Sequence, residues 1–130
     1  MNWIVILEWI VIVALVVYML IWPLIRPRLV AKIIDNLEFN QKISENAQLI
    51  DVREPAQFRQ KHILGARNIP ANQIKESISS FRKDTDILLY ENSQMKLTTA
   101  AAGRLKKAGF KNVYILKTGL SKWGGKVKQG

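Results

Sequence analysis

Hydrophobic residues are distributed very unevenly along this chain. The segment WIVILEWIVIVALVVYMLIW (residues 3–22) is apolar at 19 of its 20 positions, and Glu8 is the exception. Three later aliphatic runs are typical of short strands that are buried on both faces of a sheet. They are QLIDV (48–52), DILLY (86–90) and NVYIL (112–116). We expect residues 31–34 to form a shorter fourth strand.

Helical patterns alternate with these strands. Pro55 suits the first position of a helix that continues over residues 56–61. Two further stretches have apolar residues at helical spacing. The first contains Ile74, Ile78 and Phe81, and the second contains Leu97, Ala101, Leu105 and Ala108. Gly109 follows where a helix end favours positive φ. Strands alternating with helices predict an α/β domain with a mostly parallel sheet.

The first apolar segment predicts a transmembrane anchor. Twenty helical residues rise roughly 30 Å, which matches the hydrocarbon core of a bilayer. Aromatic residues lie toward both ends, as at a membrane interface, and they are Trp3, Trp9, Tyr18 and Trp22. A cleaved signal peptide fits less well, because no basic residue precedes the run and no small-residue cleavage site follows it. A buried core helix is seldom so long and so uniformly apolar.

The residues that flank the apolar segment predict its orientation. Arg26, Arg28 and Lys32 follow it, whereas only the terminal amine is positive on the other side. The positive-inside rule therefore places the N-terminus outside and the α/β domain in the cytoplasm. Pro23 and Pro27 are expected to discourage continuation of the helix. We predict a transmembrane anchor at 1–25, a basic juxtamembrane linker at 26–31 and the domain at 32–130.

Glu8 is the one residue of the anchor whose transfer into the bilayer costs free energy, because its side chain is a carboxylate. Because it lies one to two turns from the outer end, we expect its carboxylate to snorkel to the surface or to be protonated there. The alternative is that Glu8 pairs with the helix of another membrane protein, which would make the anchor itself an interaction subunit.

Composition excludes several kinds of chemistry. The 130 residues include no cysteine and one histidine, which excludes disulfides, thiolate metal sites and a cysteine nucleophile, and we expect neither metal nor cofactor. Residues 92–130 carry nine Lys or Arg and no acid within a net charge of +10. This basic stretch predicts contact with anionic lipid or a solvated surface. Nucleic acid is not expected, because few aromatic residues are available to stack on bases.

The chain resembles the rhodanese family of single-domain sulfurtransferases. The segment LIDVREPAQFRQKHILGARNIP (49–70) is similar to the family motif IDVREPxEFxxGHIPGAxNIP, with Lys61 in place of the first glycine. Residues 87–123 resemble the second half of the family, which has a strand, a loop, a helix ending in AGF, the run NVYIL and a final GxxxW. The resemblance implies the rhodanese fold, a parallel sheet flanked by helices, here preceded by one transmembrane helix.

The resemblance fails at the position that carries the chemistry. Active rhodaneses have a cysteine after the strand that DILLY resembles, in a loop of the form CxxGxRS whose amides stabilise anionic sulfur species. Here the loop consists of Glu91, Asn92, Ser93, Gln94, Met95, Lys96, Leu97 and Thr98. Glu91 stands at the nucleophile position, and a carboxylate cannot carry transferable sulfur. Counted from Glu91 to Gly109, the loop resembles the slightly longer one of the related cell-cycle phosphatases and arsenate reductases, which also need a cysteine.

Two residues outside this loop, Asp51 and Arg53, complete the candidate site. Asp51 and Arg53 lie two apart on an extended chain, so their side chains point to the same side and can brace the neighbouring loop. We expect this pair to support the pocket without touching a ligand. His62 is expected to be a packed or loop-bonding residue, and Ser/His/Asp hydrolysis is not expected because no nucleophile elbow is present.

These observations predict a membrane-anchored, catalytically inactive rhodanese-like domain that binds or scaffolds an unidentified protein at the cytoplasmic membrane face. Two states of the degenerate loop remain open. Glu91 itself occupies the amide cradle as an internal anion, or the loop binds a small molecule or a protein. A rival hypothesis is an enzyme that uses Glu91 as an acid–base group.

Overall fold

The protein is built around a five-stranded parallel sheet. The computed structural model describes residues 2–130. The sheet contains β1 (Lys32–Ile34), β2 (Gln48–Asp51), β4 (Arg67–Asn68), β5 (Ile87–Tyr90) and β6 (Val113–Leu116). Their order is β1-β6-β5-β2-β4, and every pairing is parallel. The predicted α/β fold and its four strands are therefore confirmed.

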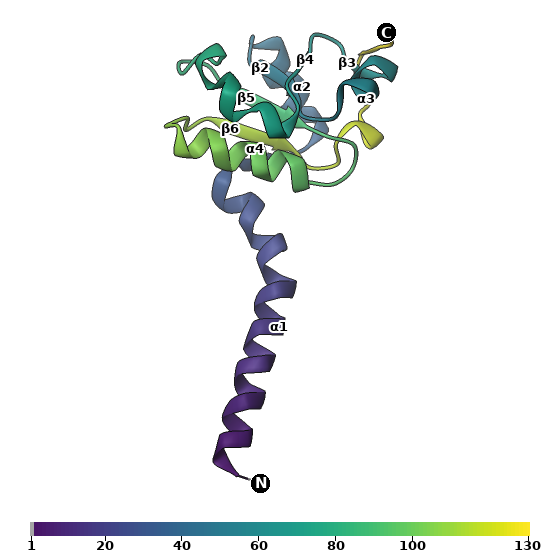
Figure 1. Cartoon of the computed structure of the whole chain (residues 1–130). Helices are drawn as coiled ribbons and strands as arrows, with labels where there is room; N and C mark the ends of the chain where they lie inside the picture. The colour runs from purple at the N-terminus through teal and green to yellow at the C-terminus, as the bar shows by residue number, and fades with distance from the viewer. Residues whose placement is uncertain (1) are drawn as a thin grey trace.

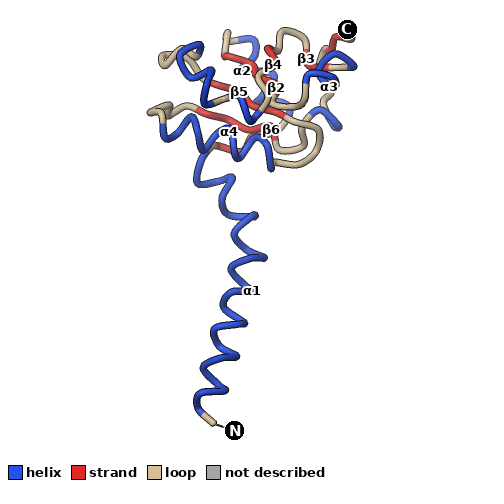
Figure 2. The backbone as a smooth tube through the Cα atoms, in the orientation of Figure 1, coloured by secondary structure: helices blue, strands red, loops and turns tan. Residues whose placement is uncertain are grey.

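Both faces of the sheet are covered, as the near-continuous aliphatic runs require (Figure 2). Alternate strand residues point to opposite faces, so that Ile87 and Leu89 belong to one core and Leu88 and Tyr90 to the other. The first core is closed by α4 (Lys96–Lys107) and by two 3₁₀ segments, η1 (Ala71–Gln73) and η2 (Lys75–Ser80). The second is closed by α2 (Asn36–Ser44), which contributes the buried Phe39.

The helices match the sequence pattern in part. The helix α3 (Pro55–Gln60) begins with proline as predicted, and α4 ends just before Gly109, whose φ is +96°. The predicted helix through Ile74, Ile78 and Phe81 is wrong in type, because this stretch forms the 3₁₀ segments η1 and η2. The sequence pattern did not predict α2, which Asp35 caps by accepting a hydrogen bond from the amide of Glu38 (3.0 Å).

A small second sheet lies at the edge of the domain. It pairs β3 (His62–Ile63) with β7 (Val127–Lys128) in antiparallel register. Each strand has two residues, which is too short for any alternation of polar and apolar positions to be recognised. A third 3₁₀ segment, η3 (Leu120–Lys122), precedes β7.

The N-terminal segment forms one long helix, α1 (Trp3–Val30), of 28 residues. It projects away from the domain, and its large apolar side chains between Trp3 and Leu24 are 36–72% exposed (Figure 1). Its most apolar window has a mean hydropathy of 2.9, so the helix is long and apolar enough to cross a membrane. The predicted N-terminal apolar helix is therefore present.

The expectation that the two prolines interrupt this helix is wrong. Pro23 and Pro27 both lie inside α1, four residues apart and thus on the same side, so the missing N–H groups weaken one side only. Pro27 is also buried, and the amide of Ala31 donates to its carbonyl (3.1 Å). Packing against the domain holds the last turns of α1 in helical form.

Candidate functional site

The two segments singled out in the sequence meet at one edge of the sheet. Strands β2 and β5 are neighbours, and Asp51 pairs with Tyr90 in their register. Residues 52–54 and 91–95 leave the sheet side by side from these positions. Carboxyl ends of parallel strands are where such sheets place their ligand sites.

A buried ion pair joins Asp51 and Arg53 at this edge. Arg53 Nη2 lies 2.7 Å from Asp51 Oδ2, and Arg53 Nε donates to both carboxylate oxygens (3.0 and 3.1 Å). The backbone amide of Arg53 donates to the same carboxylate (2.9 Å). The side chains are 5% and 0% exposed, so this pairing compensates two charges that have lost their water.

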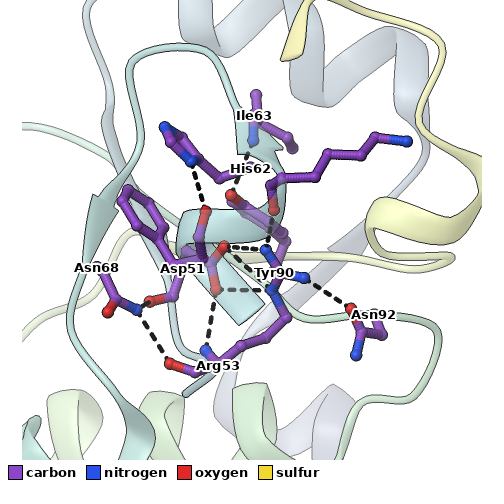
Figure 3. Close-up of polar contacts among 9 residues, drawn as sticks. Asp51, Arg53, His62, Ile63, Asn68, Tyr90 and Asn92 are labelled. Carbon is purple, nitrogen blue, oxygen red and sulfur yellow. Dashed lines mark hydrogen bonds and ion pairs between the residues drawn. The ribbon is translucent and has the colours of Figure 1, made fainter. Parts of the chain in front are cut away.

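Arg53 also ties neighbouring segments together (Figure 3). Its Nη1 donates to Asn92 Oδ1 in the degenerate loop (2.9 Å), and its Nη2 donates to the carbonyl of Lys61 (2.6 Å). Asn68 Nδ2 donates to the carbonyls of Asp51 (3.1 Å) and Arg53 (3.0 Å). The pair therefore braces the loop as its spacing predicts. The sequence does not predict that Lys61 and Asn68 bond to this pair, because contacts between separate segments leave no periodic pattern in the sequence.

Tyr90 and His62 fill the remaining space beside this network. The Tyr90 hydroxyl accepts a hydrogen bond from the amide of Ile63 (3.0 Å), and burial raises the pKa of Tyr90 far above its ordinary value. His62 stacks on Phe58 at a centroid distance of 3.7 Å, and its Nδ1 lies 2.7 Å from the Phe58 carbonyl. His62 is thus a packed residue that closes α3 onto β3, as expected from the sequence.

Glu91 lies at the position that the resemblance gives to a nucleophile, and it is only 6% exposed. Its Oε1 accepts hydrogen bonds from the amide of Thr98 (2.9 Å) and from the Thr98 hydroxyl (3.2 Å). Burial raises the pKa of the Glu91 carboxyl above its ordinary value, and the hydrogen bonds from Thr98 offset part of the increase. The carboxylate therefore caps the first turn of α4, where an external anion would otherwise bind.

The rest of the loop is divided between anchored and exposed residues. The carbonyls of Glu91 and Asn92 accept hydrogen bonds from the amides of Leu120 and Ser121 (2.8 Å each). Thr98 is buried, whereas Ser93, Gln94, Lys96 and Leu97 are exposed and Met95 is intermediate. Among residues 2–130, no three His, Asp or Glu side chains cluster in a way that could hold a metal ion.

The outer side of the loop faces α1. A hollow of about 470 Å³ separates them, lined by Trp22, Pro23, Arg26 and Pro27 of α1 and by Gln94, Met95, Lys96 and Thr99. This proximity could not be predicted from the sequence, because no pattern in either segment specifies the other. The degenerate loop is consequently next to the end of the apolar helix.

Comparison with known proteins supplies a family for this arrangement. Residues 35–126 match the family described as the rhodanese-like domain. The chain is 49% identical to the uncharacterized protein YqhL of Bacillus subtilis over 82 residues, which are 63% of this chain and 64% of YqhL. The matched part thus spans less than two thirds of YqhL. A sulfurtransferase of Allochromatium vinosum is 30% identical over 92 residues, covering 69% of this chain and 85% of that protein.

Solved structures agree with the fold. A structure described as rhodanese with anions from E. coli is 30% identical, with a TM-score of 0.58. The alignment covers 65% of this chain and 99% of that protein.

Proposed function

This chain belongs to the rhodanese-like domain family, and from that premise we propose that it is a membrane-anchored, non-catalytic member that binds or scaffolds another protein at the cytoplasmic membrane face. The observation that carries the proposal is the Glu91 carboxylate, bonded to the amide of Thr98 at the start of α4.

Sulfur transfer needs a thiolate that can become a persulfide. The chain has no cysteine, and its nucleophile position holds a carboxylate that offers no sulfur atom. The E. coli relative is described with anions, whereas here the Glu91 carboxyl group of the chain itself accepts the hydrogen bond of the Thr98 amide. An external anion would find this amide already bonded, which further disfavours thiosulfate.

The anchor is supported by the surface of α1. Large apolar side chains are exposed all along residues 3–22, and no part of the domain covers them. A soluble monomer rarely leaves so large an apolar area in water, whereas a bilayer would bury it. Arg26, Arg28 and Lys32 at the domain end favour a cytoplasmic domain and an outer N-terminus.

A second candidate function is acid–base chemistry by Glu91. The raised pKa of its carboxyl favours this candidate, because a catalytic acid or base is often tuned in this way. The binding module is preferred because the carboxylate is almost entirely buried and its Oε1 already accepts the Thr98 amide and hydroxyl. A catalytic carboxyl group would have to contact a substrate, and the buried position of Glu91 does not allow this contact.

The anchor is tested by alkaline carbonate extraction of cell membranes. We expect the full chain to remain in the membrane pellet. A variant with Leu15→Lys and Val16→Lys should be released, since each charge near the middle of the span costs about 2.5–3.5 kcal/mol. The matched variant with Leu15→Ile and Val16→Ile should stay in the pellet. Release of the unmodified chain by carbonate would contradict the anchor.

The binding role is tested by affinity capture from solubilised membranes, with the full chain and with a chain that lacks residues 1–25. A comparison of the proteins retained by the two chains distinguishes partners of the helix from partners of the domain. We expect at least one protein to be retained in near-stoichiometric amount by both chains. If the shorter chain retains none, the domain is not the binding module.

A further inference from the structure

The last turns of α1 are fastened to α4 by specific contacts. Lys106 Nζ donates to the carbonyl of Leu29 (2.8 Å), and Pro27 is buried. Gly103 of α4 lies beside Arg26, since a Cβ added at Gly103 would be 3.5 Å from a guanidinium nitrogen of Arg26. In Figure 1, α4 crosses the end of the domain from which α1 emerges. This α1–α4 junction is the part of the domain that lies closest to the apolar helix.

Three hollows border the junction, and each is lined by cations without any Asp or Glu. The first, of about 470 Å³, contains Arg26 and Lys96. The second, of about 590 Å³, contains Arg26, Arg104, Lys106 and Lys107. The third, of about 460 Å³, contains Arg28, Lys32, Lys106 and Lys111. Arg26 lines the first two, so it is central to the basic surface.

Within residues 2–130, these eight cations have no acidic partner. In residues 2–130 the ion pairs are Lys42 with Asp86 and Arg53 with Asp51, and neither includes a cation of the junction. The nearby acid, Glu91, is buried and already bonded to Thr98. Clustered cations without internal neutralisation repel one another, so an external anion would stabilise the junction.

The lining of the first hollow combines apolar and positively charged groups, which are complementary to the apolar and anionic parts of a phospholipid. Trp22, Pro23 and Met95 provide apolar lining, and Arg26 and Lys96 provide positive charge beside it. Trp22 ends the apolar segment, and Arg26 lies four residues later, which is about 6 Å along the helix axis. An interfacial tryptophan is typical at headgroup level, so in a membrane-spanning α1 these cations would lie at the depth of lipid phosphates.

Building on the proposed membrane anchoring, we propose that the α1–α4 junction is a binding site for an anionic phospholipid, with its phosphate at Arg26 and Lys96. The glycerol and upper acyl chain lie against Trp22, Pro23 and Met95. Arg104 and Lys107 extend the positive surface to neighbouring headgroups. The bound lipid holds α4 along the membrane surface and keeps residues 94–96 of the degenerate loop at the headgroups.

The test uses the full chain purified in a neutral detergent and mixed with phosphatidylglycerol or phosphatidylcholine. Native mass spectrometry counts the lipids that each chain retains. We expect preferential retention of phosphatidylglycerol, and we expect Arg26→Gln with Lys96→Gln to reduce that retention by about tenfold or more. The matched control, Lys126→Gln with Lys128→Gln, removes the same charge near the C-terminus, at the opposite end of the domain from α1 (Figure 1), and should keep it.

Three results would overturn this inference. The first is equal retention of the two lipids by the unmodified chain. The second is an equal loss of phosphatidylglycerol in both double variants, which would indicate a general charge effect. The third is full displacement of the lipid by millimolar inorganic phosphate, which would indicate a site for a free anion. Circular dichroism of each variant confirms that it is folded before its lipids are counted.

The carbonate extraction described above separates this inference from the anchor. If the chain resists carbonate but retains both lipids equally, the lipid site is wrong and the anchor proposal stands. If carbonate releases the chain, both proposals fall together.

Discussion

At the scale of single residues, two buried carboxylates at the same sheet edge are compensated in different ways. Asp51 is paired with the guanidinium of Arg53, so its charge is met by a full opposite charge. Glu91 has no such ion pair, and its Oε1 accepts hydrogen bonds from the amide and hydroxyl of Thr98, which are neutral donors. Hydrogen bonds from neutral groups compensate a buried charge less completely than an ion pair does. The two sites should therefore respond differently to substitution and to pH.

Removing Arg53 should be far more damaging than removing an exposed arginine. Arg53→Ala leaves the Asp51 carboxylate buried without its partner, and we expect a loss of about 3–5 kcal/mol in the free energy of unfolding. Arg59→Ala, in the exposed surface of α3, should cost less than about 0.5 kcal/mol. Chemical denaturation of the full chain in detergent measures both values. Adding Asp51→Asn to Arg53→Ala should restore part of the loss, and similar values for the two arginine variants would contradict the role given to Arg53.

Ionisation of Glu91 should make the fold less stable as pH rises. The pKa of Glu91 is raised by burial above its ordinary value of 4.5, so between these two values the folded chain keeps a proton that the unfolded chain has released. Stability therefore falls as pH increases from 4.5 to the raised pKa. Glu91→Gln lacks this ionisation, so its stability relative to the unmodified chain should increase across the same range. Denaturation at a series of pH values measures the difference, which would stay constant if Glu91 were not responsible.

Residue-scale features were predictable from sequence only where they are local. The common direction of Asp51 and Arg53 follows from the two-residue period of an extended chain. The Glu91 cap was one of two states that the loop composition left open, and the bond to Thr98 favours it. The carbonyl of Lys61 and the side-chain amide of Asn68 lie on other segments, and only the folded chain brings them to Arg53.

At the scale of elements, the degenerate loop is held in place by the start of η3 and by Gly119 in the turn before it. The amides of Leu120 and Ser121 donate to the carbonyls of Glu91 and Asn92. Gly119 permits this approach because it has a φ of +62°, and a Cβ there would collide with both of these carbonyl oxygens. Only glycine satisfies both the conformation and the space.

Gly119→Ala should therefore disrupt the loop. We expect a loss of at least about 1–3 kcal/mol in the free energy of unfolding, from backbone strain together with the displaced carbonyls. Gly124→Ala is the matched control, because a Cβ at that position meets nothing within 4 Å and its φ is not positive. Thermal unfolding followed by circular dichroism compares the two variants. Equal melting temperatures would show that the turn does not hold the loop.

Helices and strands with a strong hydrophobic pattern were predicted from the sequence, whereas those with a weak hydrophobic pattern were not. The aliphatic runs of β2, β5 and β6 are buried on both faces, which gives an unambiguous signal. The helix α2 buries only Phe39 fully and leaves Leu37 79% exposed, so it has little periodicity. Spacings of three and four residues occur in both α and 3₁₀ segments when they are short, which explains the error at η1 and η2.

At the scale of the whole molecule, an apolar helix runs without a break onto a small α/β domain, against which its last turns pack. Because α1 runs through both prolines and packs on α4, the helix and the domain share one continuous helical connection. The degenerate loop lies beside that connection. This placement suits a module whose exposed loop residues act near the membrane surface, and it could not be inferred from a domain boundary drawn in sequence.

The orientation of the molecule is testable with reporter fusions. We expect a C-terminal reporter that works only in the cytoplasm to be active, because Arg26, Arg28 and Lys32 are retained on the cytoplasmic side. A reporter that works only outside should be inactive at the same position. Changing these three residues to Gln should weaken this preference. Activity of only the external reporter on the unmodified chain would reverse the proposed orientation.

The central claim is that this rhodanese-like domain does not transfer sulfur because its nucleophile position holds Glu91. The most direct measurement is the rate of thiocyanate formation from thiosulfate and cyanide by the purified full chain, with Glu91→Cys and an active rhodanese assayed alongside. We predict that the unmodified chain matches its heat-inactivated control. Glu91→Cys should remain far below the active enzyme, because Gln94 replaces the loop glycine and the family arginine is replaced by Lys96 or Leu97, depending on the register. Clear turnover by the unmodified chain, abolished by heat, would contradict the account.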